Sequence, residues 1–374
     1  MRNLIDRLFA VLLPVLAVAA ALLIGAIMLL LMDADPIEAY QALYDGAFGT
    51  VNSRSETLVK ATPLLLVGIG ICIAFRGGVI NIGGEGQMIA GAVVGTYVAL
   101  KFETMPFSGT ASIYHDLPQY LTIALCMISG FLAGAFWGGI AGLLKAYFDV
   151  NEILSTIMLN QIALQLMSYL LNGVMLDPRQ RERVNHIPRT ARVPDYAQIP
   201  RVTWLTDVPI RLHYGFIIAL VLAVIIYIFL WRTTLGYRIR AVGKNQRASR
   251  YAGINVKRQM LFSMFLAGGF AGLAGTVQVL GLQYRLQTDG SAAGFTGNAG
   301  FNGIVAALFG GLHPVGAIPA SIFFGGLLIG AQSLQRTVQV PASLITTLNG
   351  LVVVFVVSSQ IFVRRRTQRR AKEQ

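Results

Sequence analysis

Ten apolar stretches run through this chain of 374 residues and constrain its fold more than any other feature. A helix rises ~1.5 Å per residue, so about 20 apolar residues cross the hydrocarbon core of a bilayer. The stretches therefore predict membrane-spanning helices, whose backbone N–H and C=O groups bond to each other rather than to lipid. The expected helices cover residues 8–32, 58–75, 84–100, 119–146, 152–172, 213–231, 259–282, 298–311, 314–332 and 343–363.

Composition agrees with a single transmembrane domain over residues 1–374. Hydrophobic residues make up 55% of the chain and charged residues only 13%, whereas soluble domains carry about 25% charged residues. The 40 glycines fit the same class, because membrane helices use glycine to bring their backbones close together. We expect an all-α polytopic membrane protein with ten transmembrane helices.

Three of the ten stretches differ from a simple crossing. The stretch 8–32 is longer than the ~7–15 apolar residues of a signal peptide, and no small-residue cleavage pattern follows it, so we expect a retained helix. The stretch 84–100 begins with polar residues, and 298–311 is too short to span a bilayer alone. One or two broken or re-entrant helices, buried in protein, are therefore expected.

The formal net charge of +13 is unevenly distributed along the chain. With a cytoplasmic N-terminus and alternating crossings, 18 of the 30 Lys and Arg residues lie inside, eight of them in 232–258 and six in the tail 364–374. Seven of the other 12 lie in 173–212, which we expect to be a structured external loop. Positive charge concentrates on the cytoplasmic side of membrane proteins. This places both termini inside and explains the charge without nucleic acid.

A weak internal repeat is visible in two of the stretches. FLAGAFWGGIAGLL at 131–144 and FLAGGFAGLAG at 265–275 share Phe-Leu-Ala-Gly-x-Phe. Duplicated halves are common in transporters, where the transport path lies between them, whereas chance similarity of Gly- and Ala-rich helices would look the same. The repeats would cover about 58–172 and about 259–363, with the external loop and the cytoplasmic segment 232–258 between them.

Glycines recur every four residues in the stretch 119–146. This spacing puts them in a smooth strip on one helix face. The strip predicts close packing against another helix, and the lining of a pathway is the alternative. Its members are Gly130, Gly134, Gly138 and Gly142.

The stretch 152–172 carries two polar stripes side by side. One consists of Glu152, Thr156 and Asn160, and the other of Gln161, Gln165 and Ser168. In hydrocarbon such groups need partners, so they face the bundle interior or a watered cavity. They supply either hydrogen bonds between helices or a path for a polar, uncharged solute.

The Gly-rich break RGGVINIGGEGQ, residues 76–87, places the carboxylate of Glu85 between two apolar stretches. A charge at the bilayer centre costs ~2.5 kcal/mol or more, so Glu85 should be paired, lie near an interface or face water. We interpret the break as a broken helix entry near the solute path, and a helix start that Glu85 caps is the structural alternative. The residues expected along the path are Asn81, Glu85, Gln87, Asn160, Gln161, Gln165, Asn298 and Asn302.

Residues 232–258, RTTLGYRIRAVGKNQRASRYAGINVKR, contain eight basic residues and no acidic one. An exposed basic loop on the cytoplasmic side requires no further explanation. However, Asn245 is a suitable N-cap and Gly253 a suitable C′ residue for a short helix at about 246–252. A capped helix in this loop indicates a docking point for a cytoplasmic partner.

No nucleotide-binding or catalytic motif accompanies these features. The nearest approach to a P-loop, AVGKN, has Arg238 where the first Gly belongs and Asn245 where Ser or Thr belongs. The four histidines are widely separated, so neither a metal site nor a Ser-His-Asp triad is expected. The chain therefore cannot bind ATP through a P-loop of its own.

Five stretches, in order along the chain, resemble the permease subunits of bacterial ATP-binding-cassette importers in the branched-chain amino acid and simple-sugar superfamily. The likeness covers about 58–363 and is greatest for the branch that takes up nucleosides with basic-membrane-lipoprotein-type binding proteins. The five stretches are GGVINIGGEGQMIAGA, NEILSTIMLNQIA, RLHYGFIIAL, RTTLGYRIRAVGKNQRASRYAGI and LAGGFAGLAG.

The resemblance implies a ten-helix permease in the bacterial inner membrane, without a cofactor of its own. The implied partners are cytoplasmic ATPase subunits that hold ATP and Mg, a second permease chain and an external solute-binding lipoprotein. The family commonly has Pro after the capping Asn and then two alanines, whereas this chain has Gln246 and Ala248-Ser249. By position, the implied ATPase-coupling residues are Asn245, Arg247, Ala248, Tyr251 and Gly253.

Two other classes of protein share some of these features. An ion- or proton-coupled secondary transporter would also show a repeat and broken helices, but it should keep several intramembrane carboxylates, and Glu85 is the one clear candidate. An intramembrane enzyme would need a paired nucleophile and base, which the sequence does not suggest. The prediction is a permease subunit for a nucleoside-like or simple-sugar solute, driven by separate ATPase subunits.

Overall fold

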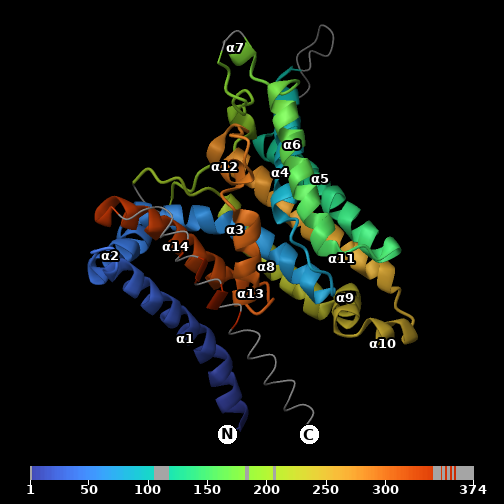
Figure 1. The fold of residues 1–374 in the computed structure, drawn as a ribbon. Helices are drawn as coiled ribbons and strands as arrows, with labels where there is room; N and C mark the ends of the chain where they lie inside the picture. The colour runs from blue at the N-terminus through green and yellow to red at the C-terminus, as the bar shows by residue number, and fades with distance from the viewer. Residues whose placement is uncertain are drawn as a thin grey trace.

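The computed structural model describes residues 2–104, 118–181, 185–204 and 208–339, together with six single positions between 347 and 358. These residues form helices joined by turns, and β pairing among them is limited to two isolated bridges, Arg189 with Gln287 and Arg201 with His213 (Figure 1). The helices are α1 (Arg2–Leu30), α2 (Pro36–Tyr44), η1 (Asp45–Gly49), α3 (Val51–Arg76), α4 (Gly84–Thr104), α5 (Gln119–Phe148), α6 (Glu152–Asn172), α7 (Pro178–Arg181), η2 (Asp195–Ala197), α8 (Gly215–Arg232), α9 (Thr234–Lys244), α10 (Gln246–Tyr251), α11 (Val256–Gln278), η3 (Val279–Gln283), α12 (Ala292–Thr296), α13 (Ala299–Phe309) and α14 (Ala317–Val338).

Six helices of the described residues are long and apolar enough to cross a membrane: α3, α5, α6, α8, α14 and the 28-residue unit of α11 and η3. The stretches predicted at 84–100 and 298–311 form α4, which is continuous over 21 residues, and α13, which has only 11. At ~1.5 Å per residue, α13 is too short to cross a bilayer. The stretch 343–363 lies mostly outside the described residues, so ten crossings stay a prediction.

Two helices, α3 and α11, form the centre of the bundle (Figure 1). In the apolar part of each, 78% of the residues are buried, compared with 28% in α6 and 33% in α8. A helix that is apolar and buried on all sides belongs to a core, whereas the exposed apolar faces of α6 and α8 suit contact with lipid. The central pair therefore sets the positions of the other helices.

Close glycine contacts bring α5 and α11 together in antiparallel directions. A Cβ atom added at Gly134 would lie 2.6 Å from the Cα atom of Gly272, and one added at Gly138 would lie 2.9 Å from the Cα atom of Gly268. Backbones approach this closely only where side chains are absent. The strip that the sequence shows lies against α11 along its length: Gly130, Gly134, Gly138 and Gly142.

The molecule has two different loop-rich ends, which lie opposite each other (Figure 1). At one end, the described part of segment 173–212 packs over the chain that follows η3. The backbone N–H groups of Thr190 and Val193 donate there to the carbonyl oxygens of Leu286 and Tyr284. At the other end, α9 and α10 connect α8 to α11. A solute path through the bundle would join these two ends.

Candidate functional site

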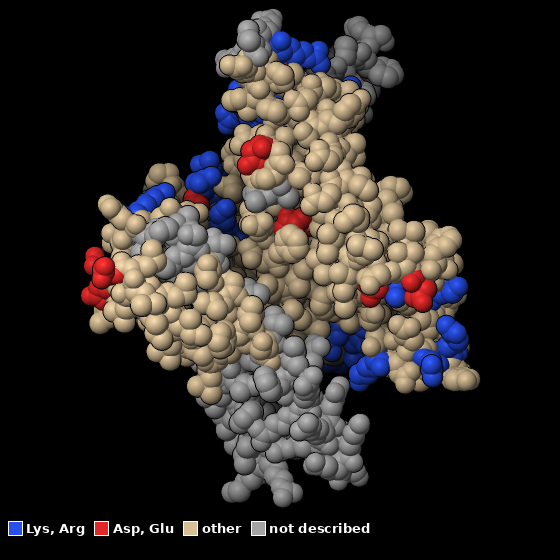
Figure 2. Space-filling view, viewed as in Figure 1, with Lys and Arg blue, Asp and Glu red and all other residues tan. Residues whose placement is uncertain are grey.

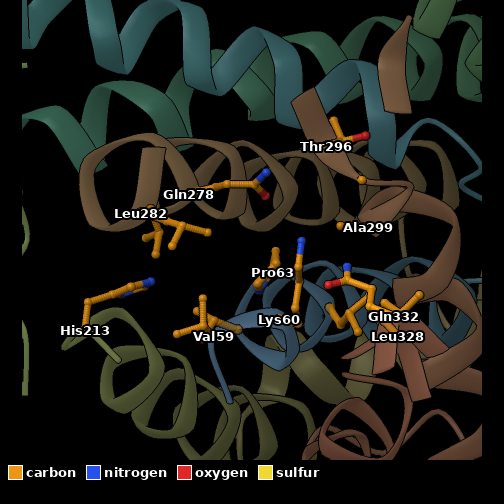
Figure 3. Close-up of a pocket in the computed structure, with 14 residues that line it drawn as sticks. Val59, Lys60, Pro63, His213, Gln278, Leu282, Thr296, Ala299, Leu328 and Gln332 are labelled. Carbon is orange, nitrogen blue, oxygen red and sulfur yellow. The ribbon is translucent and has the colours of Figure 1, made fainter. Parts of the chain in front are cut away.

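A cavity of about 190 Å³ lies between α3, the end of α11, the α12–α13 turn and α14 (Figure 3). Its apolar walls include Val59, Leu64, Leu282 and Leu328. Apolar walls with a few placed polar groups are typical of sites for small molecules, although such sites usually enclose ~300–1,000 Å³. The cavity is therefore narrow, and a solute would pass only if helices move. The polar side chains that line it are Lys60, Thr62, His213, Gln278, Thr296 and Gln332.

Gln278 presents an open hydrogen-bond acceptor in the cavity wall. Its side chain is 9% exposed, its amide nitrogen donates to the Phe295 carbonyl oxygen, and its Oε1 atom is buried without a hydrogen-bond partner among the described residues. The amide nitrogen of Gln283 donates to the same carbonyl oxygen at 3.2 Å. An unpaired buried acceptor costs ~1–3 kcal/mol. A solute that donates a hydrogen bond to Gln278 would recover this free energy.

Lys60 points into the cavity from α3, toward Gln278 on the opposite wall (Figure 3). The carboxylate of Glu56, one turn earlier, pairs with Arg211, with 3.3 Å between Oε1 and Nη1. No acidic side chain is among the described residues that line the cavity, so the Lys60 ammonium group is a donor for a solute there. The sequence analysis did not assign Lys60 to the site, although a cation inside a predicted membrane helix is a functional signal.

His213 is buried beside the cavity, just before α8. Its Nδ1 atom accepts a hydrogen bond from the Gly215 N–H at 3.1 Å. Burial, and secondly the charge of Arg201, lower the pKa of His213 to about 4. The imidazole ring is therefore neutral at physiological pH, and it adds no charge to the cavity.

The Gly-rich break before α4 forms a buried polar network. The side-chain amides of Asn81 and Gln87 donate to each other at 2.9 and 3.0 Å. Asn160 on α6 accepts the Gly86 N–H at 2.8 Å and donates to the Ile82 carbonyl oxygen at 3.1 Å. Because these amides bond within the protein, they fix the break against α6 and leave little hydrogen-bonding capacity for a solute.

Glu85, in the first turn of α4, links α4 to α13. The carboxylate is 1% exposed, and its Oε1 atom accepts the Phe301 N–H at 3.2 Å. The two backbones also approach closely, since a Cβ atom added at Gly84 would lie 3.1 Å from the Cα atom of Gly300. A carboxylate beside the free N–H groups of a helix start is favourable. Glu85 thereby holds the α12–α13 turn, which carries Thr296 into the cavity wall.

The remaining predicted path residues lie apart from this network. Gln161 and Gln165 are exposed on α6, Asn298 is exposed in the turn before α13, and Asn302 is partly buried on α13. None of the eight predicted residues lines the cavity, whose described walls come from other positions.

The segment between α8 and α11 contains the short helix α10, Gln246–Tyr251, which ends one residue before the predicted 246–252. The Asn245 side chain accepts the Ala248 N–H at 3.1 Å and so caps the helix start. Gly253 follows with a φ of +75°, a left-handed conformation that suits glycine. Arg247 and Ala248 are exposed, and Tyr251 is 93% exposed. The exposed side chains of α10 therefore do not pack in the protein core.

The same segment touches the Gly-rich break. A Cβ atom added at Gly243, the residue before the last of α9, would lie 2.9 Å from the backbone nitrogen of Gly78. Gly78 has a φ of +77° and lies two residues after the end of α3. The segment that carries α10 therefore contacts the break from one side, while Glu85 connects the other side of the break to the cavity wall.

A helix bundle with a narrow polar cavity between its central helices and a protruding helix at one end has the features of the membrane part of a transporter. No cluster of three or more His, Cys, Asp or Glu side chains that could hold a metal ion occurs in the described part of the chain. Residues 53–357 match the family described as the permease component of the branched-chain amino acid transport system. The chain belongs to this permease family, and it is a transport component rather than an enzyme.

Relatives match over nearly the whole chain. The guanosine ABC transporter permease protein NupP of Bacillus subtilis is 37% identical over 95% of this chain and 95% of its own length. The glucose ABC transporter permease protein TsgB13 of Haloferax volcanii is 33% identical over 94% of this chain and 88% of its own. The nucleoside ABC transporter permease protein NupB of Lactococcus lactis is 32% identical over 92% and 90%. No solved structure gives a significant match.

Proposed function

We propose that this protein is the membrane-spanning subunit of an ATP-binding-cassette importer that takes up a nucleoside across the bacterial cytoplasmic membrane. Two of the relatives named above are permeases for guanosine or nucleosides, and the third, a permease for glucose, leaves a simple sugar as the alternative solute. The cavity supports an uncharged polar solute, because Gln278 offers an acceptor and Lys60 a donor to hydroxyl groups and base edges.

The observation that carries the proposed mechanism is α10, a capped and exposed helix in a chain without a nucleotide-binding motif. We assign it as the contact for cytoplasmic ATPase subunits, which would bind ATP and Mg. The end that holds segment 173–212 would then face an external solute-binding lipoprotein, with both chain termini in the cytoplasm. A second permease chain completes the proposed complex.

The contacts of the Gly-rich break provide a route from α10 to the cavity. Displacement of α10 and α9 would press Gly243 against Gly78, and the rigid amide network would transfer this movement to α4. Glu85 would carry it on to the α12–α13 turn. Coupling between distant sites needs an element that both sites bias, and the proposal assigns this role to the break.

Substitution of α10 tests the coupling. We expect Arg247→Ala with Tyr251→Ala to reduce ATP-driven uptake about tenfold or more, while expression and solute binding persist, because each truncation removes a contact residue of the kind that dominates interfaces. Tyr120→Ala is the matched control, since Tyr120 is 79% exposed and follows Gln119, whose side chain donates to the Gln198 carbonyl oxygen at the opposite end of the molecule. Normal uptake by the double variant would contradict the proposal, as would solute accumulation by the purified chain alone in vesicles.

Substitution of the cavity tests the solute site. Gln278→Leu and Lys60→Met each remove one solute contact, and we expect the apparent affinity for nucleoside uptake to fall about tenfold. Gln161→Leu makes the same chemical change on the exposed face of α6 and should leave uptake unchanged. Equal effects of the two Gln→Leu substitutions would show that the cavity is not on the solute path.

A further inference from the structure

A group of cationic and aromatic side chains lies where α3, α8 and α13 end, close to α9. Trp231 is at its centre, with the guanidinium carbon of Arg76 at 5.1 Å and that of Arg240 at 5.4 Å from the centre of the indole ring. The rings of Tyr227 and His313 pack on Trp231 at centroid distances of 5.4 and 4.7 Å. Cations over an indole are held in place by the charge distribution of the ring. We call these five residues the Trp231 cluster.

Acidic residues are absent from the sequence around α8 and α9. The chain contains no acidic residue between Asp207 and Asp289, and none of the three ion pairs among the described residues involves α9. Arg240 is only partly buried, and Arg238 is exposed. The planar guanidinium groups of these two residues are suited to hydrogen bonds with phosphate oxygens.

The outer face of α9 combines apolar, aromatic and basic side chains. Ile239 and Val242 are buried against the bundle, whereas Leu235, Tyr237 and Arg238 are exposed. Lys and Arg side chains gather around α9 and α10, and most of the bundle surface above them is uncharged (Figure 2). Basic helices of this kind lie in the membrane interface, with aromatic rings at the level of the headgroups.

We propose that α9 and the Trp231 cluster bind the phosphate of an anionic phospholipid in the cytoplasmic leaflet. The inference rests on the proposed orientation. Arg76 and Arg232 are the last residues of α3 and α8, so the cluster lies at the depth where the membrane helices end, whereas α10 extends farther from the bundle. Negatively charged lipid headgroups occur at that depth and attract basic residues. Arg240 and Arg238 would contact the phosphate, and Leu235 and Tyr237 the upper part of the acyl chains.

The proximity of lipid to Trp231 can be measured directly. The full chain with Trp137→Phe and Trp204→Phe keeps Trp231 as its single tryptophan, and it is placed in nanodiscs that contain phosphatidylglycerol or phosphatidylcholine with brominated acyl chains in equal amounts. Bromine quenches nearby indole fluorescence. We expect brominated phosphatidylglycerol to quench Trp231 at a concentration about fivefold lower than brominated phosphatidylcholine. Equal quenching by the two lipids would overturn the proposal.

Three double variants distinguish a specific lipid site from general charge attraction. Arg238→Gln with Arg240→Gln should abolish the preference for phosphatidylglycerol, and Arg238→Lys with Arg240→Lys should keep part of it. Arg247→Gln with Arg250→Gln removes the same charge from α10 and should keep all of it; a matching loss in this control would overturn the proposal. Displacement of the lipid by millimolar glycerol 3-phosphate would also overturn it, because the site would then belong to a soluble phosphate. Loss of uptake with an intact lipid preference would count only against the proposed function.

Discussion

At the scale of single residues, buried polar groups decide how the helices meet. Glu85 is fully surrounded by protein and accepts a backbone N–H from the start of α13. Asn81 and Gln87 satisfy each other, so the cost of burying amides in this region is largely offset within the protein. Gln278, in contrast, lines the cavity and has an Oε1 atom without a hydrogen-bond partner among the described residues. These details separate residues that hold the structure from residues that are free to meet a solute.

Substitution of Glu85 tests its structural role. We expect Glu85→Ala to lower the free energy of unfolding in detergent by about 1–3 kcal/mol, because the Phe301 N–H loses its acceptor. Glu85→Gln keeps an acceptor oxygen and should cost less, and Glu85→Lys should reduce uptake more than membrane insertion. The measurements are thermal unfolding of the purified chain and nucleoside uptake at matched expression. Equal stability of the Glu85→Ala and Glu85→Gln variants would contradict the structural role of Glu85.

The buried ring of His213 makes stability depend on pH. Its pKa is about 4 in the folded protein, below the ~6.5 of an unfolded histidine, so the unfolded chain binds a proton first as the pH falls. The contribution of neutral His213 to the free energy of unfolding is fully present above pH ~6.5. This contribution decreases as the pH falls toward ~4. The melting temperature in detergent should fall as the pH is lowered from ~6.5 to ~4. The His213→Gln variant should show a smaller fall than the unsubstituted protein.

At the scale of elements, glycine determines which helices form the core. The strip on α5 places backbone against backbone along α11, where the smallest side chain would collide with main-chain atoms. Sequence spacing shows such a strip clearly, because four-residue intervals repeat on one helix face. It does not show which partner the strip meets, since several stretches of this chain are rich in Gly and Ala.

Two alanine substitutions on α5 test this packing. Gly134→Ala puts a Cβ atom 2.6 Å from the Gly272 Cα atom, whereas Gly139→Ala meets nothing closer than a ring carbon of Phe265 at 3.6 Å. We expect Gly134→Ala to destabilise the protein by about 1–3 kcal/mol through overpacking and Gly139→Ala to be neutral or slightly stabilising. Thermal unfolding of both variants in one detergent gives the comparison. Similar unfolding free energies for the two variants would mean that the backbones of α5 and α11 do not lie in close contact at Gly134.

At the scale of the whole molecule, the two ends differ in structure. One end is an ordered cover over the chain after η3, and the other carries a basic interfacial helix and a protruding capped helix. The apolar surfaces of α6 and α8 suit a lipid environment, and the narrow cavity between the central helices lies nearer to the covered end. Under the proposed mechanism, movement at one end would change access to the cavity from the other.

Labelling of single cysteines tests the proposed orientation. Cys72 and Cys126 are both 0% exposed, so they give little background. We expect Tyr120→Cys to react with a membrane-impermeant maleimide in intact cells, after removal of any outer barrier, and Tyr251→Cys to react only after the membrane is opened. Labelling of Tyr251→Cys from outside would invert the topology and remove the basis for an ATPase contact at α10.

The sequence alone determined the class of protein, the positions of most apolar helices and the capped helix at Gln246–Tyr251. These features depend on local physics: the length of an apolar run, the spacing of glycines, and the side-chain oxygen of Asn245 three residues before a free N–H. The tertiary structure alone decided the cavity, because Lys60, Gln278 and Gln332 come from helices far apart in the chain, and no periodicity specifies where three helices converge. It also decided which polar groups are already satisfied, since a hydrogen bond between Asn160 and the break depends on the fold that brings α6 beside α4.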